Sequence, residues 1–446
     1  MFSTEYRLHY KKTLQLAYPV CISNLGHIAV GIVDTAMVGR IGTIEQAGVA
    51  LANSLYYLIF VFGVGISFGV TPLVAAADAE KNKPALGELL KNSLVVNTVT
   101  GILLFILLIA LSPALSLLHQ PKEVVAVAIS FLNIMAISFI PLSLFAALKQ
   151  YTEGMSLTKI AMIVSITGNL LNVLFNYLLI FGHWGFTPMG VMGSCWASVI
   201  ARIVMAAAMF AYIFYGKAFK EYLKDFRKIP MSFSLSKKIL AIGVPSGLQW
   251  VFEVGAFSFA VIMVGWISPQ AQAAHQIAIN LAAAAYMVVS GIASAASVRV
   301  GNYRGLNDNE NIRKAGFSGL IISFAFMCIT ACCFILFKNL LPLFFNRDEE
   351  VIAIASSLLL IAAVFQLADG VQAVALGLLR GMKDVNFPTT VAIIAYWGIS
   401  LPCSYVFAFT FNKGAEGVWY GLTLGLFTVA AVLAWRFNYI SKHVNL

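Results

Sequence analysis

The chain has 446 residues, of which 60% are apolar and 11% are charged, and its formal net charge is +10. A soluble domain carries about 25% charged residues, so this composition excludes a soluble globular protein. Apolar stretches of roughly 18 or more residues, each able to cross a bilayer as a helix, recur along the whole length. The sequence therefore predicts an all-α polytopic membrane protein with no separate soluble domain.

The opening segment, MFSTEYRLHYKK, is charged and is followed by a long apolar run without a small-residue cleavage site. We expect a cytoplasmic lead-in to the first helix rather than a signal peptide that is removed. The six cysteines lie within apolar runs and lack metal-ligand spacing, so they are expected to behave as small apolar residues without a disulfide framework.

Twelve membrane-spanning helices are predicted from the apolar runs. They cover residues 13–38, 46–78, 92–118, 124–150, 157–182, 190–216, 239–267, 272–304, 315–344, 350–380, 386–412 and 415–440. Around these helices, 23 Lys and Arg residues fall on the side of the N-terminus and 5 on the opposite side. Because basic connections stay in the cytoplasm, both termini are predicted to be cytoplasmic.

The one long hydrophilic connection, 217–238, is rich in Lys and Arg. It separates a predicted N-lobe, 1–216, from a C-lobe, 239–446, with six helices each. A basic loop here is attracted to the anionic cytoplasmic leaflet, and the alternative is a protein partner. The positive charge follows the predicted membrane boundaries, so we expect no nucleic acid partner.

The two lobes are related by a shift of 226 residues. Without a gap, this shift pairs Pro19 with Pro245, Val38 with Val264, Gly39 with Gly265, Ile41 with Ile267, Gln46 with Gln272, Ala47 with Ala273, Gly65 with Gly291 and Ile66 with Ile292. Repeats with an even number of helices enter the membrane in the same direction. They are related by a pseudo-two-fold axis along the membrane normal, with a substrate site near the midplane, which is typical of transporters.

Four charged residues are predicted to lie at bilayer depth, away from the ends of the predicted helices: Asp34, Arg202, Glu253 and Asp369. An ionisable side chain at bilayer depth costs roughly 2.5 to 3.5 kcal/mol on insertion scales, so each is expected to face the protein interior and to have a function. Arg202 could pair with one of the acids or extend toward water.

Each C-lobe acid shares a helix face with an amide and an aromatic ring. The two faces are Gln249, Glu253 and Phe257, and Phe365, Asp369 and Gln372. If Glu253 and Asp369 approach each other, both stay ionised only with a proton or a metal cation between them. Oxygen ligands suit hard cations such as Na+, so Glu253, Asp369, Phe257, Phe365 and Gln249 are the predicted coupling-cation site. The alternative is a pair of buried acids that hold helices together.

A polar stripe in the N-lobe predicts a substrate cavity. It consists of Asn24, His27 and Asp34 on the first helix and Asn172 and Asn176 on the fifth, to which Gln372 adds a C-lobe amide. An aromatic face near such groups attracts organic cations. Asparagines are also ordinary contacts between membrane helices, and His27 and His275 could either shuttle protons or pack.

Motifs for direct ATP use or hydrolysis are absent from the sequence: it has no phosphate loop, no HExxH and no GxSxG. We therefore expect neither enzymatic activity nor a cofactor.

Several stretches resemble the multidrug and toxic compound extrusion (MATE) family, in particular its NorM branch. They are GIVDTAMVG around Asp34, GVPSGLQWVFEVGAF around Glu253, AAHQIAIN from Ala273, ASVRVGNYRG from Ala296 and FQLADGVQAVALGLLRGMKD from Phe365. The resemblance implies an antiporter in which a gradient of Na+ or H+ drives export of amphipathic organic cations by alternation of two lobes. NorM-type members are commonly associated with Na+.

The resemblance also implies residue roles. It assigns Asp34 to the N-lobe cavity and assigns Glu253 and Asp369 to the coupling cation. Some relatives have an Asp four residues after the Asn of the fifth helix, whereas this chain has Asn172 and Asn176. Asp34 is thus the single acid predicted for the N-lobe cavity, and Arg202 matches no family motif.

Two other functions compete with this interpretation. A flippase or exporter of lipid-linked or polar metabolites would favour a basic cavity, but the sequence has three acids and only one Arg at the predicted bilayer depth. A lipid-modifying enzyme would need a nucleophile or metal cluster that the sequence does not present. The expected partners are organic cations and membrane lipids, with a monomer in the plasma membrane, which is the inner membrane in a Gram-negative bacterium.

Overall fold

The computed structural model describes residues 4–118, 120–221, 223 and 226–443, and in this part the regular structure is entirely helical. The α-helices are α1 (Thr4–Gly39), α2 (Thr43–Ser67), α3 (Thr71–Ala79), α4 (Lys83–Leu111), α5 (Lys122–Ile137), α6 (Phe139–Gly154), α7 (Thr158–Phe181), α8 (Val191–Tyr215), α9 (Phe233–Gly265), α10 (Pro269–Gly305), α11 (Asn309–Leu336), α12 (Glu349–Gly381), α13 (Asn386–Ile393), α14 (Leu401–Tyr405) and α15 (Gly414–Lys442). The prediction of an all-α protein is confirmed.

Membrane-spanning capacity follows from length and apolar composition. Among the described residues, 11 helices could cross a membrane, and a twelfth results if α5 and α6, bent by 43°, form one span. Large apolar side chains also lie exposed on these helices, such as Leu103, 59% exposed, and Ile329, 63% exposed. Exposed apolar surface on this scale is expected where lipid takes the place of water.

Two of the predicted helix ends are wrong, whereas the predicted span 46–78 agrees with one candidate span, Thr43–Ala79. Within this span a short break separates α2, which ends at Ser67, from α3, which begins at Thr71. A Cβ atom on Gly69, within this break, would lie 2.2 Å from the Ile239 oxygen, so the break lets α9 approach closely. The predicted span 315–344 already ends at Leu336, where a turn and the short 3-10 helix η4 (Pro342–Phe344) follow. In the linker 217–238, α9 already begins at Phe233.

The chain forms two compact units. The N-terminal unit is Ile22–Gly247, and the C-terminal unit combines the described residues of Met1–Cys21 with those of Leu248–Leu446. The chain thus passes from one unit to the other inside α1 and inside α9, rather than in the linker. These two points correspond to each other under the 226-residue shift, since it pairs Ile22 with Leu248.

Each unit includes a helix crossing that the same shift relates. In the N-terminal unit, a Cβ atom on Gly65 of α2 would lie 2.3 Å from the Cα atom of Gly247 in α9. In the C-terminal unit, a Cβ atom on Gly291 of α10 would lie 2.7 Å from the Cys21 nitrogen in α1. Glycine is needed at both crossings because the backbones approach too closely for a side chain.

Polar contacts fix the two exchanged helix segments, which are the start of α1 and the start of α9. The buried Arg299 of α10 donates hydrogen bonds to the His9 carbonyl (2.8 Å) and the Thr13 hydroxyl (2.6 Å) of α1. In the N-terminal unit, the Asn92 side-chain oxygen of α4 accepts a hydrogen bond from the Ser236 hydroxyl of α9 (2.9 Å). The start of α1 therefore belongs to the C-terminal unit, and the start of α9 belongs to the N-terminal unit.

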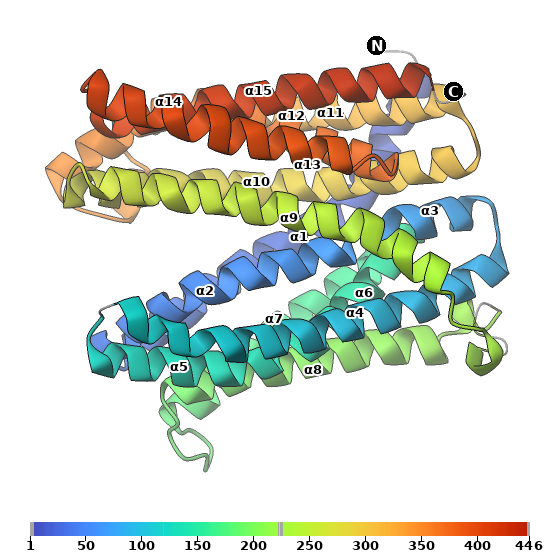
Figure 1. The fold of residues 1–446 in the computed structure, drawn as a ribbon, viewed down its shortest axis with the longest axis horizontal. Coiled ribbons are helices and arrows are strands. Elements are labelled where there is room, and N and C mark those ends of the chain that lie inside the picture. The colour runs from blue at the N-terminus through green and yellow to red at the C-terminus, as the bar shows by residue number, and fades with distance from the viewer. Residues whose placement is uncertain (1–3, 119, 222, 224–225, 444–446) are drawn as a thin grey trace. The chain divides into compact units, whose positions relative to one another are not determined.

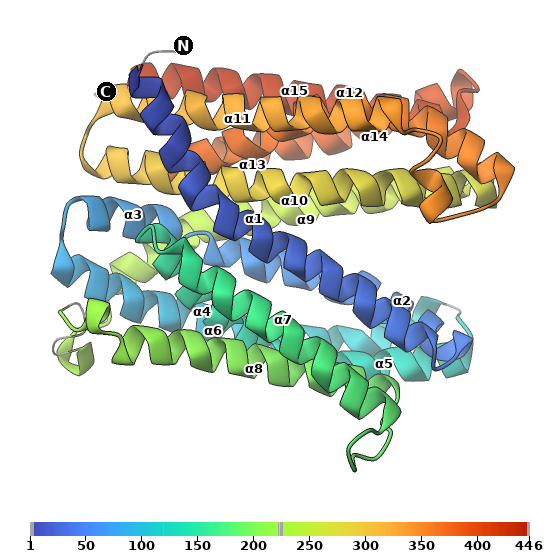
Figure 2. The same ribbon diagram turned by 180° about the vertical axis from the view of Figure 1, so that it is seen from behind.

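Within the C-terminal unit, α12 is the central helix. It packs against α10, α11 and α15, which run alongside it (Figure 1). Most of the second half of α12 is therefore buried, including Phe365, Asp369 and Gln372. In the N-terminal unit, α7 and α8 pack side by side (Figure 2).

Candidate functional site

Glu253 lies at the centre of the polar cluster in the C-terminal unit. Its carboxylate accepts hydrogen bonds from the Gln249 amide (3.1 Å) on the same helix and from the Gln372 amide (2.9 Å) on α12. The hydroxyl of Tyr396 donates a third (3.0 Å). Three donors on one carboxylate stabilise its charged form, since hydrogen bonds to ionised groups are the stronger ones.

Asp369 lies in a different environment although it belongs to the same cluster. Its side chain is buried, and it makes no hydrogen bond to any part of the chain that the structure describes. The charge of Glu253 acts directly on it. The structure thus brings the two predicted acids together and gives hydrogen-bond donors to one of them. Gln372 was predicted to line the substrate cavity, but its amide donates a hydrogen bond to Glu253.

Tyr396 is the member of the cluster that the sequence prediction missed. It lies in the π-helical segment η5 (Ile394–Ser400), between α13 and α14. Pro402 follows within α14, and because it has no N–H group it leaves a carbonyl of the preceding turn without its usual partner, which favours the wider helix. Single π-helical turns are frequent at functional sites. The apolar run around Tyr396 carries no sequence signal for this role.

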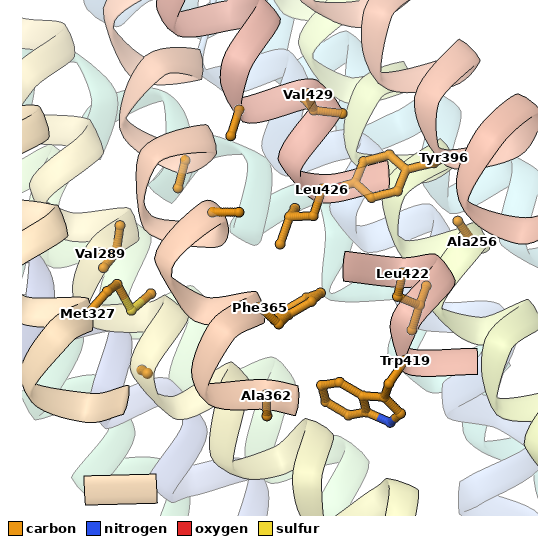
Figure 3. Close-up of a cluster of buried hydrophobic side chains, with 14 of the residues drawn as sticks. Ala256, Val289, Met327, Ala362, Phe365, Tyr396, Trp419, Leu422, Leu426 and Val429 are labelled. Atoms are coloured by element: carbon orange, nitrogen blue, oxygen red, sulfur yellow. The ribbon is translucent and has the colours of Figure 1, made fainter. Parts of the chain in front are cut away.

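Aromatic rings surround one side of the cluster. The Phe257 ring contacts Phe365 (centroids 6.1 Å apart) and Tyr396 (5.9 Å). Figure 3 shows Phe365 beside Trp419, whose centroids are 5.5 Å apart. The Trp419 indole N–H donates to Nδ1 of the buried His275 (3.0 Å). This contact favours the packing role over the proton-shuttle role for His275.

The Tyr396 hydroxyl is expected to contribute measurably to stability. Tyr396→Phe leaves a buried carboxylate with one donor fewer, which costs about 1–3 kcal/mol. Thermal unfolding of the purified protein in detergent should show the loss as a lower Tm. Tyr405→Phe is the matched control, because Tyr405 belongs to the same span and is 52% exposed. Equal melting temperatures for the two variants would contradict the hydrogen-bonding role.

The polar stripe of the N-terminal unit joins three helices. The Asn176 amide of α7 donates to Asp34 of α1 and to the Asn172 side-chain oxygen (3.2 Å). The Asn172 amide in turn donates to the Ser198 hydroxyl of α8 (3.2 Å). The structure therefore brings three of the predicted cavity residues into one hydrogen-bonded chain.

Of the other cavity residues predicted on α1, His27 lies outside this chain. Asn24 is partly buried, whereas the side chain of His27 is exposed and has no hydrogen bond to the described residues. Between them in sequence, Gly26 lies close to α7, because a Cβ atom there would lie 3.0 Å from the Asn169 amide nitrogen. α1 therefore packs against α7 at Asn169, near the middle of α7.

Arg202 of α8 neither forms an ion pair with one of the acids nor extends toward water, the two alternatives that the sequence left open. Its Nη1 atom donates hydrogen bonds to the hydroxyls of Tyr56 and Ser138, and the guanidinium lies 5.6 Å from the Tyr56 ring centroid. Ser138 occupies the break between α5 and α6. The charge of Arg202 acts on Asp34 without a direct ion pair. The partners are distant in sequence, so no local pattern could have indicated them.

The sequence profile of the MatE family matches residues 19–178 and again residues 245–406. The two matches begin at Pro19 and Pro245, which are the residues that the 226-residue shift pairs. The internal repeat predicted from the sequence is therefore confirmed.

Curated relatives match over nearly the whole chain. A "Probable multidrug resistance protein NorM" from Rhizobium meliloti is 31% identical over 98% of this chain and 95% of its own length. "Multidrug resistance protein PmpM" from Pseudomonas aeruginosa is 31% identical over 99% of this chain and 94% of its own length.

Solved structures share the fold at lower sequence identity. The crystal structure of the eukaryotic MATE transporter AtDTX14 has a TM-score of 0.87 at 20% identity and covers 98% of both chains. An outward-facing multidrug resistance MATE family transporter has a TM-score of 0.89 at 19% identity, and the match covers 99% of this chain and 100% of that chain.

Proposed function

The chain belongs to the MatE family of multi-pass membrane transporters, and on this basis we propose that it is a multidrug efflux antiporter that uses a gradient of Na+ or H+ to export amphipathic organic cations. The relatives named multidrug resistance proteins support drug efflux. The ion coupling is supported by the polar cluster at Glu253. The proposed location is the plasma membrane, with both termini in the cytoplasm, as the excess of Lys and Arg on that side favours.

The proposed ion coupling is based on the difference between the environments of Glu253 and Asp369. Glu253 accepts three hydrogen bonds, whereas Asp369 has no donor among the described residues, so the charged form of Glu253 is the better stabilised of the two. Two carboxylates in one buried cluster repel each other unless a cation lies with them. Asp369 is therefore the group that takes up the proton, or the oxygen ligand that meets Na+, while Glu253 supplies the fixed negative charge.

Cation uptake produces transport only through a difference in affinity between two conformations. A cation at Asp369 removes the repulsion between the acids and so favours the arrangement in which the cluster is compact. A drug that binds the other arrangement more tightly is then released, since two ligands that prefer different states oppose each other. The typical coupling free energy of about 1–3 kcal/mol is sufficient for this exchange.

The N-terminal unit suits the drug better than the coupling ion. Asp34 carries one negative charge, and the positive charge of Arg202 acts on it. This near-neutral polar region attracts a small inorganic cation less strongly than the paired acids of the C-terminal unit. We assign the amine of the drug to Asp34, with Asn172 and Asn176 as polar contacts, and the coupling cation to Glu253 and Asp369.

Reconstituted protein tests the ion coupling directly. Proteoliposomes loaded with a cationic dye receive either a Na+ gradient or a pH gradient, and dye efflux is recorded for each. We expect efflux to depend on at least one gradient and to stop when that gradient is collapsed by an ionophore. Dye efflux of equal rate without any ion gradient would contradict the antiport mechanism.

A further inference from the structure

The start of α1 is attached to the C-terminal unit along one narrow stripe of buried side chains. The stripe consists of His9, Thr13, Ala17 and Val20. Residues at intervals of three and four share one face of a helix, and the rest of this segment is open, as Leu8, 50% exposed, shows. Two of the four residues are polar, so the attachment depends on hydrogen bonds as well as on apolar packing.

Arg299 of α10, only 3% exposed, supplies the hydrogen bonds to both polar residues of the stripe. Its Nη1 atom donates to the His9 carbonyl (2.8 Å) and to the Thr13 hydroxyl (2.6 Å). Its Nη2 atom contacts Nδ1 of the His9 ring (2.7 Å). The Thr13 hydroxyl in turn donates to the His9 carbonyl (3.1 Å). The polar half of the attachment therefore depends on one guanidinium.

The contact between Arg299 and the His9 ring fixes the protonation state of the ring. A guanidinium is always protonated and can only donate hydrogen bonds. Nδ1 of His9 is therefore the acceptor, which requires a neutral ring with its proton on Nε2. A second proton would lie on Nδ1 and point at an N–H group of Arg299. Because like charges repel strongly in a buried site, the contact exists only with neutral His9.

Other ionisable groups surround the His9 ring. On α10, the Tyr303 ring lies 6.0 Å from the imidazole, between centroids. Between α10 and α11, Asp308 is close enough for a charge on His9 to act on its carboxylate. On α1 itself, Tyr6 and the exposed Lys12 lie one turn away on either side. Asp308 thus favours a protonated ring, whereas the guanidinium in contact with Nδ1 opposes it.

We propose that His9 and Arg299 form an acid-sensitive latch, which holds the start of α1 on the C-terminal unit at neutral pH and releases it when His9 is protonated. Histidine is the side chain that ordinarily changes its charge between about pH 5 and 8. The contacts of the latch are complete above this range and are lost as the pH falls through it. Since α1 begins on the side predicted to be cytoplasmic, the latch responds to the cytoplasmic pH.

Hydrogen exchange of the purified full chain in lipid nanodiscs tests the latch at about pH 7.5 and about pH 5.5, near the two ends of the histidine range. After correction for the intrinsic pH dependence of exchange, the amides of residues 4–14 should exchange at least about tenfold faster at the lower pH, because a helix segment without its tertiary contacts opens more often. Equal corrected rates at the two pH values in the wild type would overturn the proposal.

Variants of His9 separate the latch from a general loosening in acid. His9→Asn places a neutral amide oxygen near the position of Nδ1, so it should keep the hydrogen bond from Arg299 and exchange slowly at both pH values. His443→Asn is the matched control, because His443 is an exposed histidine of the same unit, and it should keep the wild-type response. A response that persists in His9→Asn, or that disappears in His443→Asn, would overturn the proposal.

His9→Ala tests the attachment without a change of pH. It removes the acceptor of Arg299, so residues 4–14 should exchange fast at both pH values. Slow exchange in this variant at neutral pH would show that the ring does not hold the segment. If the variant does not fold, His9→Asn alone decides, since it retains an acceptor. The exchange experiment involves no transport, so its outcome is independent of the proposed efflux function.

Discussion

Asp369→Asn is expected to reduce gradient-driven dye efflux by about 100-fold, and Glu253→Gln to reduce it to a similar extent. Asparagine keeps the size of the side chain but can neither take up a proton nor contribute a negative charge to Na+. Coupling between cation and drug is thereby lost, and coupling free energies of about 1–3 kcal/mol correspond to roughly 5- to 150-fold effects. Efflux from proteoliposomes under an imposed Na+ or pH gradient measures the loss.

Glu349→Gln provides the matched control for this prediction. Glu349 is an exposed acid at the start of α12, the same helix that carries Asp369, and its substitution removes the same charge. We expect near wild-type efflux for this variant. If Asp369→Asn and Glu253→Gln each transport as well as Glu349→Gln does, the coupling cation binds elsewhere.

Gly65→Ala is expected to destabilise the N-terminal unit strongly. The new Cβ atom would lie 2.3 Å from the Cα atom of Gly247, a backbone atom that cannot rotate away, so α2 and α9 must separate. Overpacking of this kind costs about 1–3 kcal/mol or more. Thermal unfolding of the purified protein in detergent, followed by the loss of monodisperse protein, measures the change in Tm.

Gly31→Ala is the appropriate comparison for Gly65→Ala. Gly31 also lies inside a helix of the N-terminal unit, but a Cβ atom there would meet no atom within 4 Å. The change removes backbone freedom from the unfolded chain and is expected to be neutral or to stabilise by up to about 1 kcal/mol. A Tm for Gly65→Ala equal to that of Gly31→Ala would show that the two backbones are not in close contact.

The order and number of the helices could be predicted because apolar runs report where the chain meets lipid. The helix ends could not, because a helix and its apolar run do not have the same limits: α9 begins before its predicted span, and α11 ends at Leu336, before the end of its predicted span. In α9, for example, the segment from Phe233 to Lys238, which has four polar residues out of six, is helical, and the contact of Ser236 with Asn92 fixes it. That contact joins residues 144 apart, so it leaves no local sequence pattern.

The candidate site was predictable only along single helices. The spacing of Gln249 and Glu253 placed them on one face, and their hydrogen bond reflects that spacing. Tyr396 donates a hydrogen bond to Glu253, which lies 143 residues earlier in the chain. Because Tyr396 belongs to a π-helical segment, the period of 3.6 residues does not predict the direction of its side chain. Arg202 was recognised as unusual, but its partners Tyr56 and Ser138 depend on how α8 packs against α2 and the α5–α6 break.

The exchange of helix segments between the units has a consequence for the order in which the protein can be made. His9 leaves the ribosome 290 residues before Arg299, the side chain that holds it in place. The first helix therefore waits for most of the remaining chain before it packs, which exposes it to mispairing during synthesis. Fragments separated just before Phe233 would each lack one segment, 233–247 in the first and 4–21 in the second. Neither half of the duplicated chain is thus a self-sufficient building block, and each completes the other.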